Sequence, residues 1–171
     1  RPLLERIAEA NRPVVVSTAG LSMPKIDRLV SFFETRNVDF ALMHCVAIYP
    51  TPNDQLNLNQ SDVLKKRFPN IPIGFSTHED PNDFNPIRVA YAKGARIFER
   101  HVGMQTKKHK LNKYSSSPAE VAKWLEAYKE TADMCGGEHR SPATPEEIAS
   151  LRSLMRGVYA KREIKKGLKI T

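Results

Sequence analysis

The chain has 171 residues, 40% hydrophobic and 27% charged, a composition typical of one globular domain with a real core and room for a short appendage. Its apolar runs are too short to span a bilayer, and it does not open on a charged-then-apolar leader, so we expect neither membrane insertion nor secretion. The net charge of +8 is spread without an aromatic-studded basic motif, which favours solvated faces first, a small anionic substrate second and nucleic acid a distant third.

Short apolar runs alternate with amphipathic segments along the chain. After a short helical segment at residues 3–10, four apolar runs predict strands at residues 14–17, 40–44, 71–75 and 95–99. Helices are predicted at residues 23–36, with Ser22 before the first turn, at 60–68 and at 83–93, and a Pro-rich loop at residues 45–57. This alternation predicts a parallel β/α architecture.

Two capping signatures predict the last helices. Ser117-Pro118-Ala119-Glu120 reads as a capping box with proline in the first turn, opening a helix that ends near Gly136. Thr144-Pro145-Glu146-Glu147 repeats the pattern and opens a helix to about residue 156. The tail at residues 158–171 alternates like a strand, with a turn at Gly167.

The number of predicted strands bears on the fold class. Right-handed crossovers place the loops after parallel strands on one common face. An eight-stranded (β/α)8 barrel has about 250 residues, so four βα units amount to half of one. The chain is therefore expected to form either a small open sheet or a partial TIM barrel whose first half is missing. It does not begin with methionine, which we take to indicate a fragment.

Two histidines follow neighbouring strands of this predicted sheet. His78 ends the run Gly74-Phe75-Ser76-Thr77-His78, and His101 ends Phe98-Glu99-Arg100-His101. Because side chains alternate along a strand, Ser76 shares a face with His78, and Glu99 shares one with His101. We therefore expect two imidazoles, a carboxylate and a hydroxyl to converge at one edge, where metals and anionic substrates are held.

The two cysteines, Cys45 and Cys135, form neither a disulfide framework nor a CxxC pair. Unpaired thiols are typical of a reducing compartment, which predicts a cytoplasmic protein. No base is paired with Cys45 in the sequence, so it is not a candidate nucleophile.

An ordered set of motifs resembles the sialic acid (N-acetylneuraminate) synthase family over nearly the whole chain. The set is Pro13-Val14-Val15-Val16-Ser17-Thr18, His44-Cys45, Tyr49-Pro50-Thr51-Pro52, Asn57-Leu58, Gly74-Phe75-Ser76-Thr77-His78, Glu99-Arg100-His101 and residues 156–167. The resemblance implies a (β/α)8 barrel followed by an antifreeze-like (SAF) domain. Residues 1–156 would be strands five to eight with their helices, and residues 157–171 the linker and start of the second domain. It also implies a homodimer.

The same resemblance implies a reaction and a set of site residues. Family members condense phosphoenolpyruvate with an aldehyde (N-acyl) sugar to a 2-keto-3-deoxy sugar acid, using a divalent metal, Mn²⁺ or Mg²⁺. Matched residue by residue, the implied roles are metal ligation by His78 and His101, catalysis by Glu99, and substrate binding by Ser17, Ser76, Tyr49 and Asn112. The half-barrel alone is expected to be inactive, because the rest of the site would lie in the other half.

Departures from the family pattern keep an alternative open. Ala47 replaces a common asparagine, and residues 110–113 replace a Gly-Pro-Asp segment, with Asn112 nearest to its aspartate. These changes also fit a non-catalytic or divergent half-barrel that binds metal or sugar. For Glu99 the alternative role is a salt bridge with Arg96 or Arg100, and Arg100 is expected to point away from the barrel interior. His44 is interpreted as a core or supporting residue rather than a ligand.

Overall fold

The computed structural model describes residues 2–169 of the chain. The chain divides into two compact units, Arg1–Gly136 and Gly137–Thr171. The prediction that the barrel portion extends to residue 156 concerns the parent protein and stays a prediction. No helix within the described residues is long and apolar enough to cross a membrane.

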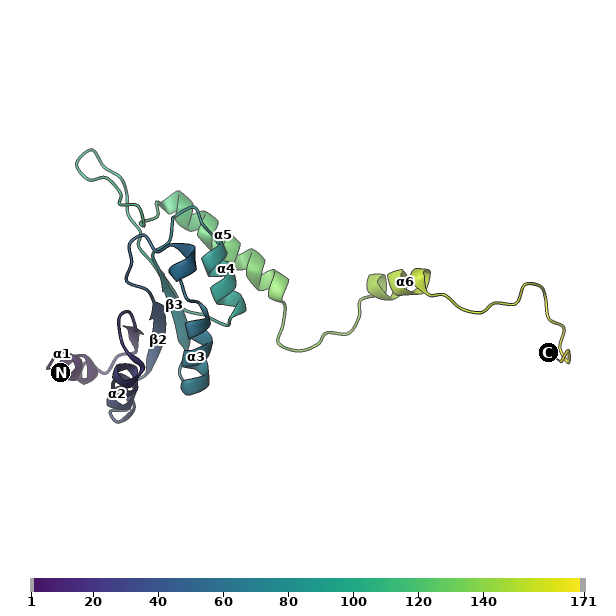
Figure 1. Cartoon of the computed structure of the whole chain (residues 1–171), viewed down its shortest axis with the longest axis horizontal. Helices are drawn as coiled ribbons and strands as arrows, with labels where there is room; N and C mark the ends of the chain where they lie inside the picture. Colours follow the sequence, from purple (N-terminus) through teal and green to yellow (C-terminus); the bar gives the residue numbers. More distant parts are fainter. Residues whose placement is uncertain (1, 170–171) are drawn as a thin grey trace. The chain divides into compact units, whose positions relative to one another are not determined.

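The first unit is an α/β half-barrel, shown in Figure 1. Its helices are α1 (Pro2–Glu9), α2 (Met23–Glu34), α3 (Asn59–Arg67), α4 (Asn85–Ala92) and α5 (Pro118–Cys135), with a 3-10 turn at Asn53–Gln55. Its strands are β1 (Val14–Ser17), β2 (Phe40–Cys45), β3 (Ile73–Thr77) and β4 (Phe98–Arg100). All strand pairs are parallel, in the order β1-β2-β3-β4. The predicted fold class, a partial TIM barrel, is confirmed.

The hydrophobic core lies between the sheet and helices α2 to α5. Leu42 and Ile73 pack against Ile26, Val30 and Leu64 of α2 and α3. Further clusters join β3 and β4 to α4 and α5, with Phe75, Phe98, Ala90, Ile87 and Trp124 as members. This side of the sheet is called the helix face below.

The opposite side of the sheet is called the inner face. Residues that alternate with the core positions point there, including Val15 and Ser17 of β1, which are exposed. At Gly74 a Cβ would collide with the Met43 sulfur and the Ile97 carbonyl oxygen. Glycine is therefore required where β2, β3 and β4 approach each other on this face.

Two strands start two or three residues later than predicted, and β2, β3 and β4 end one or two residues later. β3 begins at Ile73 rather than residue 71, and β4 begins at Phe98 rather than residue 95. The Ala95 amide donates to the Ala90 carbonyl and Gly94 has φ +86°, so this stretch completes the turn after α4. Local hydrogen bonds therefore end the helix where apolar composition alone predicts strand.

Both predicted capping signatures are present. The Ser117 side chain accepts from the Glu120 amide while the Glu120 carboxylate accepts from the Ser117 amide. In the second unit, the Thr144 hydroxyl accepts from the Glu147 amide at the start of α6 (Pro145–Leu154). Residues 158–169 form no strand, so the prediction of a strand-like tail is wrong for them. The described residues of the second unit include no strand with which these alternating residues could pair. Residues 170–171 lie outside the described part.

Candidate functional site

The carboxyl ends of β3 and β4 bring the two predicted histidines together. Ser76 of β3 lies opposite Glu99 of β4, and Thr77 opposite Arg100. His78 and His101 follow directly, and their ring centroids are 5.1 Å apart. The alternation in the sequence and the parallel register thus produce the expected convergence of imidazoles.

Hydrogen bonding orients the ring of His78. Its Nδ1 lies 3.0 Å from the Val46 carbonyl oxygen. Since a carbonyl only accepts, Nδ1 carries the hydrogen in this contact, and Nε2 presents a lone pair. Burial lowers the pKa of His78, the nearby His101 lowers it further, and the Val46 carbonyl and Glu99 oppose the shift. The ring is therefore neutral at pH 7, the form that ligates metals.

Two tyrosines surround the histidine pair. The ring of Tyr49, in the loop after β2, lies 4.3 Å from that of His78 and 5.0 Å from that of Tyr114. The Tyr114 ring lies 5.2 Å from that of His101. Tyr49 is a predicted site residue, whereas sequence reasoning missed Tyr114. Its position immediately before the capping box was the available signal, because that helix start returns the chain to the end of β4.

The hydroxyl and carboxylate expected beside the histidines have different surroundings. Ser76 is buried on the inner face and Glu99 is exposed. The proposed alternative, a salt bridge of Glu99 with Arg96 or Arg100, does not occur among the described residues. Arg100 pairs with Glu79, and Arg96 donates to main-chain carbonyls. The Glu99 carboxylate is thus available beside the imidazoles.

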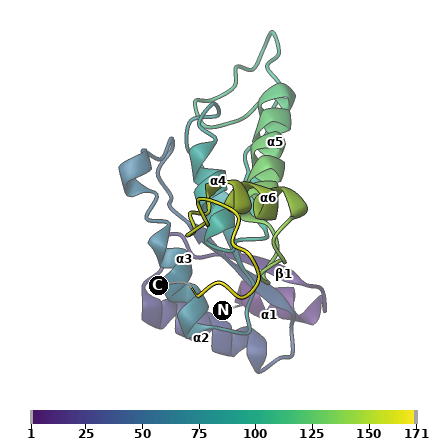
Figure 2. The ribbon, with the colours of Figure 1, turned by 90° about the vertical axis from the view of Figure 1, so that its right-hand side faces the viewer.

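The remaining two predicted substrate contacts lie farther along the same edge. Ser17 ends β1, two strands from β3, and its hydroxyl accepts from the Ala19 amide at 3.3 Å. Asn112 is exposed in the loop between β4 and α5, where its side chain accepts from the Tyr114 amide at 3.1 Å. Figures 1 and 2 show this loop extending past the start of α5. The described residues therefore bring five of the seven candidates to adjacent positions, whereas Ser17 lies two strands away and Asn112 contacts the main chain of Tyr114.

The histidine pair offers two of the ligands that the divalent metal implied by the family resemblance requires. Within residues 2–169 no three His, Cys, Asp or Glu side chains gather closely enough to hold a metal ion. His78 and His101 are two suitably oriented nitrogen donors, and Mn²⁺ accepts imidazole together with oxygen ligands. The pair fits a metal as two of its ligands, with water or substrate oxygens supplying the others.

A second histidine environment lies on the helix face. His44 of β2 is buried, its Nε2 is 2.8 Å from the Leu56 carbonyl oxygen, and its ring stacks on Phe75. Burial lowers its pKa, partly opposed by that carbonyl. His44 points away from the His78–His101 pair and lies in the core. This agrees with its interpretation from the sequence as a core or supporting residue rather than a ligand.

Sequence reasoning also missed a buried carboxylate next to His78. Glu79 points to the helix face, where its Oε1 lies 2.7 Å from Nη1 of Arg100, and the two side chains are 1% and 3% exposed. Burial raises the pKa of Glu79, and the positive charge of Arg100 opposes that shift. Arg100 points away from the inner face, as expected.

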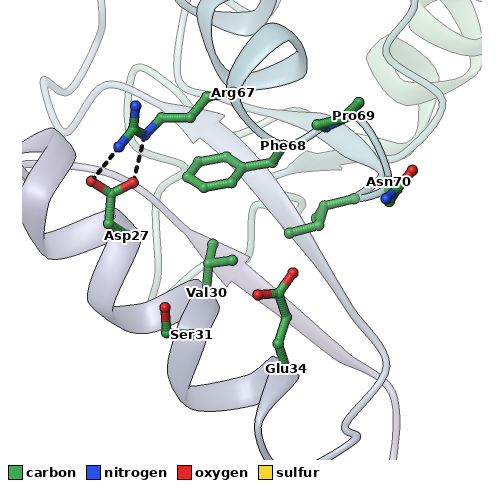
Figure 3. Close-up of a pocket in the computed structure, with 9 residues that line it drawn as sticks. Asp27, Val30, Ser31, Glu34, Arg67, Phe68, Pro69 and Asn70 are labelled. Carbon is green, nitrogen blue, oxygen red and sulfur yellow. Dashed lines mark hydrogen bonds and ion pairs between the residues drawn. The ribbon is translucent and has the colours of Figure 1, made fainter.

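The cavity of about 450 Å³ in Figure 3 belongs to a different part of the sheet. It lies between the carboxyl-terminal half of α2 and the turn that leads into β3, with Phe68 inside it and the Asp27–Arg67 ion pair at its margin. This is the amino-terminal edge of the strands. In β/α barrels, residues at the amino-terminal edge of the strands contribute to stability, whereas the reacting groups lie at the carboxyl-terminal edge.

The fold and the polar carboxyl edge define the class: half of a β/α-barrel protein with two imidazoles at the carboxyl edge of its sheet. The NeuB family matches residues 1–140, and the chain belongs to that family. The N-acetylneuraminate-9-phosphate synthase of Drosophila melanogaster is 30% identical over 193 residues, covering 99% of this chain and 51% of that protein.

Two solved structures resemble the chain. A proposed spore coat polysaccharide biosynthesis protein E from Chromobacterium violaceum has 47% identity and a TM-score of 0.86, covering 94% of this chain and 48% of that one. N-acetylneuraminic acid (sialic acid) synthetase from Leptospira borgpetersenii serovar Hardjo-bovis, in complex with citrate, has 30% identity and a TM-score of 0.77, covering 91% and 55%. The chain thus spans about half the length of these relatives.

Proposed function

We propose that the protein to which this chain belongs is a condensing synthase that joins phosphoenolpyruvate to an aldehyde (N-acyl) sugar. The product would be a sialic-acid-like 2-keto-3-deoxy sugar acid. The observation that carries the proposal is the pair of imidazoles, 5.1 Å apart, at the carboxyl edge of a parallel sheet in a NeuB-family chain. That edge is where β/α-barrel enzymes place their reacting groups.

His78 and His101 would hold the divalent cation, Mn²⁺ or Mg²⁺. When bound, such a cation supplies Lewis acidity toward an aldehyde oxygen. The protein's contribution is the orientation of His78 by the Val46 carbonyl, which leaves Nε2 free to ligate, while burial favours the neutral ring.

The remaining candidates would bind substrates and handle protons. In the condensation, C3 of phosphoenolpyruvate attacks the aldehyde carbon, water adds at C2, and the C2–O bond breaks to release phosphate. Glu99 would take the proton of the attacking water, because its carboxylate is exposed and unpaired by Arg96 or Arg100. Ser17 and Ser76 would donate to phosphoenolpyruvate oxygens, and Tyr49 and Asn112 would hold the sugar.

The assembly and location of the protein are also proposals. The homodimer is the assembly that the family resemblance implies for the longer protein; the open edge of β1 would be paired there by the other half of the barrel. The free thiols of Cys45 and Cys135 fit a cytoplasmic location. Size-exclusion chromatography with light scattering tests the first statement; a monomer would contradict it.

A Mn²⁺ titration of the wild-type chain and its His78→Ala and His101→Ala variants tests the metal centre. We expect each substitution to weaken binding, whereas His109→Ala, in an exposed loop, should bind as wild type does. Equal binding by all four proteins would contradict the assignment. Turnover of phosphoenolpyruvate by the 171-residue chain alone would contradict the expectation that the half-barrel is inactive.

A non-catalytic module that binds metal or sugar is the second candidate function. It is favoured by Ala47 in place of a polar residue and by the lack of a third protein ligand among the described residues. Phosphate release by the longer protein, supplied with phosphoenolpyruvate, N-acyl sugar aldehydes and Mn²⁺, distinguishes the two. Metal binding without phosphate release would favour the module.

A further inference from the structure

We propose that the buried ion pair of Glu79 and Arg100 is a positioning device that sets the spacing and orientation of His78 and His101. Glu79 directly follows one histidine, and Arg100 directly precedes the other. The pair lies on the helix face, while the histidines point to the inner face. The positioning of the two histidines does not depend on the proposed function; only its purpose, holding a metal ion, rests on that function.

The bonds of Arg100 connect three separate segments at the strand ends. Its Nη1 donates to Glu79 and its Nη2 to the Asp80 carbonyl, both in the segment after β3. Its Nε donates to the Ser116 hydroxyl at 2.5 Å, just before α5. Its guanidinium also lies 5.7 Å from the Trp124 ring of that helix. Arg100 therefore joins the end of β3, the end of β4 and the start of α5.

A hydrogen bond to its carbonyl oxygen also holds the main chain of each histidine. The Ser116 amide donates to the His101 carbonyl at 2.9 Å, so Ser116 contacts both Arg100 and His101. The Thr51 amide donates to the His78 carbonyl at 3.0 Å. These bonds fix each histidine locally, and the ion pair is the side-chain link between the two strand ends on the helix face.

The energetics of the pair favour positioning over stability. Burying two charges costs desolvation that their attraction offsets only with complete hydrogen bonding. The Glu79 Oε2 atom is buried and has no hydrogen-bond partner among the described residues. In other proteins, an apolar pair of similar volume often stabilises the fold at least as well as a buried ion pair. What the ion pair adds is one defined geometry at the point where the imidazoles must converge.

Three substitutions in the 171-residue chain test this role: Arg100→Lys keeps the charge but loses the three-way connection, Glu79→Gln removes the negative charge, and Ser116→Ala removes a single bond of Arg100. Asp62→Asn is the matched control, because it breaks the Lys93–Asp62 ion pair, of 2.6 Å, between α3 and α4. Each protein is measured for unfolding by denaturant, for Mn²⁺ affinity by electron paramagnetic resonance, and for histidine ring resonances by NMR.

We expect Arg100→Lys and Glu79→Gln to weaken Mn²⁺ binding about 10–100-fold, the range typical of residues that orient metal ligands. The ring resonances of His78 and His101 should shift while those of His109 do not, and Asp62→Asn should match wild type in both readouts. Folded variants with wild-type affinity and unshifted His78 and His101 resonances would overturn the proposal.

Two outcomes separate this inference from the proposed function. If the wild-type chain binds no Mn²⁺, the metal centre fails, and the ring resonances of the variants still decide whether the pair positions the histidines. If Arg100→Lys and Glu79→Gln do not fold, Ser116→Ala decides. A shift of the His78 and His101 resonances in that variant supports the proposal, and wild-type resonances overturn it.

Discussion

The carboxyl ends of β3 and β4 are held on both faces of the sheet, whereas the end of β1 is held mainly on one. At β3 and β4, the Glu79–Arg100 pair lies on the helix face and the cluster of Tyr49, His78, His101 and Tyr114 on the inner face. At β1, Thr18 donates to the Met43 carbonyl through both its hydroxyl and its amide, but Ser17 on the inner face is exposed.

This difference separates two requirements of the proposed site. Two imidazoles that share a ligand must be held at a defined spacing before it binds, because a displacement of about 1 Å lowers activity strongly. A serine that donates to a substrate oxygen can adopt its rotamer when the substrate arrives. The dense network at β3 and β4 is consistent with the first requirement.

The largest contrast is expected from Glu79→Ala against Ser17→Ala. Removing Glu79 leaves the Arg100 charge buried without its partner, which typically costs about 3–5 kcal/mol of unfolding free energy. Ser17→Ala removes one exposed hydroxyl and should change stability by less than about 0.5 kcal/mol. Urea denaturation followed by circular dichroism measures both. Similar losses in the two variants would contradict the contrast between the strand ends.

The next contrast separates the two faces of the sheet near β1. Leu42→Ala, at a fully buried position on the helix face, should cost about 2–5 kcal/mol through lost burial and a residual cavity. Val15→Ala, at a 55% exposed position on the inner face, should cost less than about 0.5 kcal/mol. The same denaturation measurements apply. A large loss for Val15→Ala would show that further contacts cover this face.

A pH-dependent contrast is expected at β2. The pKa of His44 is lowered by burial, so below pH 6.5 the unfolded chain binds a proton that the folded chain does not. Stability should therefore fall as the pH decreases below that value, by up to about 1.4 kcal/mol per pH unit for one histidine. His44→Gln should flatten this slope in denaturation curves between pH 7 and pH 5. An unchanged slope would contradict the lowered pKa.

The smallest effect concerns the helix cap beside the ion-pair network. Ser117→Ala removes the side chain that accepts from the Glu120 amide and should cost the first unit about 1 kcal/mol. Thr144→Ala removes the corresponding cap of α6 in the second unit and should leave the unfolding of the first unit unchanged. Hydrogen exchange of the amides in α5 and α6 measures the loss of stability in each helix separately. Equal protection of α5 in wild type and Ser117→Ala would contradict the prediction.

Much of the fold could be predicted because its signals are local. Apolar runs and helix caps are spaced as in a β/α chain, and the capping box at Ser117 is present as predicted. The convergence of His78 and His101 follows from period-two alternation and parallel pairing. The predicted strand start at residue 95 was wrong because Ala95 is bonded into the turn after α4. The tail strand was wrong for residues 158–169, because a strand requires a partner.

The parts of the site that sequence reasoning missed depend on contacts between distant residues. Glu79 and Arg100 are 21 positions apart, and neither residue indicates its partner. Tyr114 reaches His101 only because Ser116 pairs with Val102 and returns the loop to the end of β4. The roles of the seven candidate residues stay predictions, since they concern ligands and chemistry.

The sequence by itself determined the β/α alternation, the parallel sheet and the edge to which both histidines belong, because strand periodicity and capping act over a few residues. The choice of a half-barrel over a small open sheet came from the family resemblance. Only the tertiary structure decided which carboxylate is buried, which arginine is its partner, and which second tyrosine covers the imidazoles. Those choices arise from packing of the β4–α5 loop, the end of β3 and α5, and the energies involved depend on burial that no local pattern encodes.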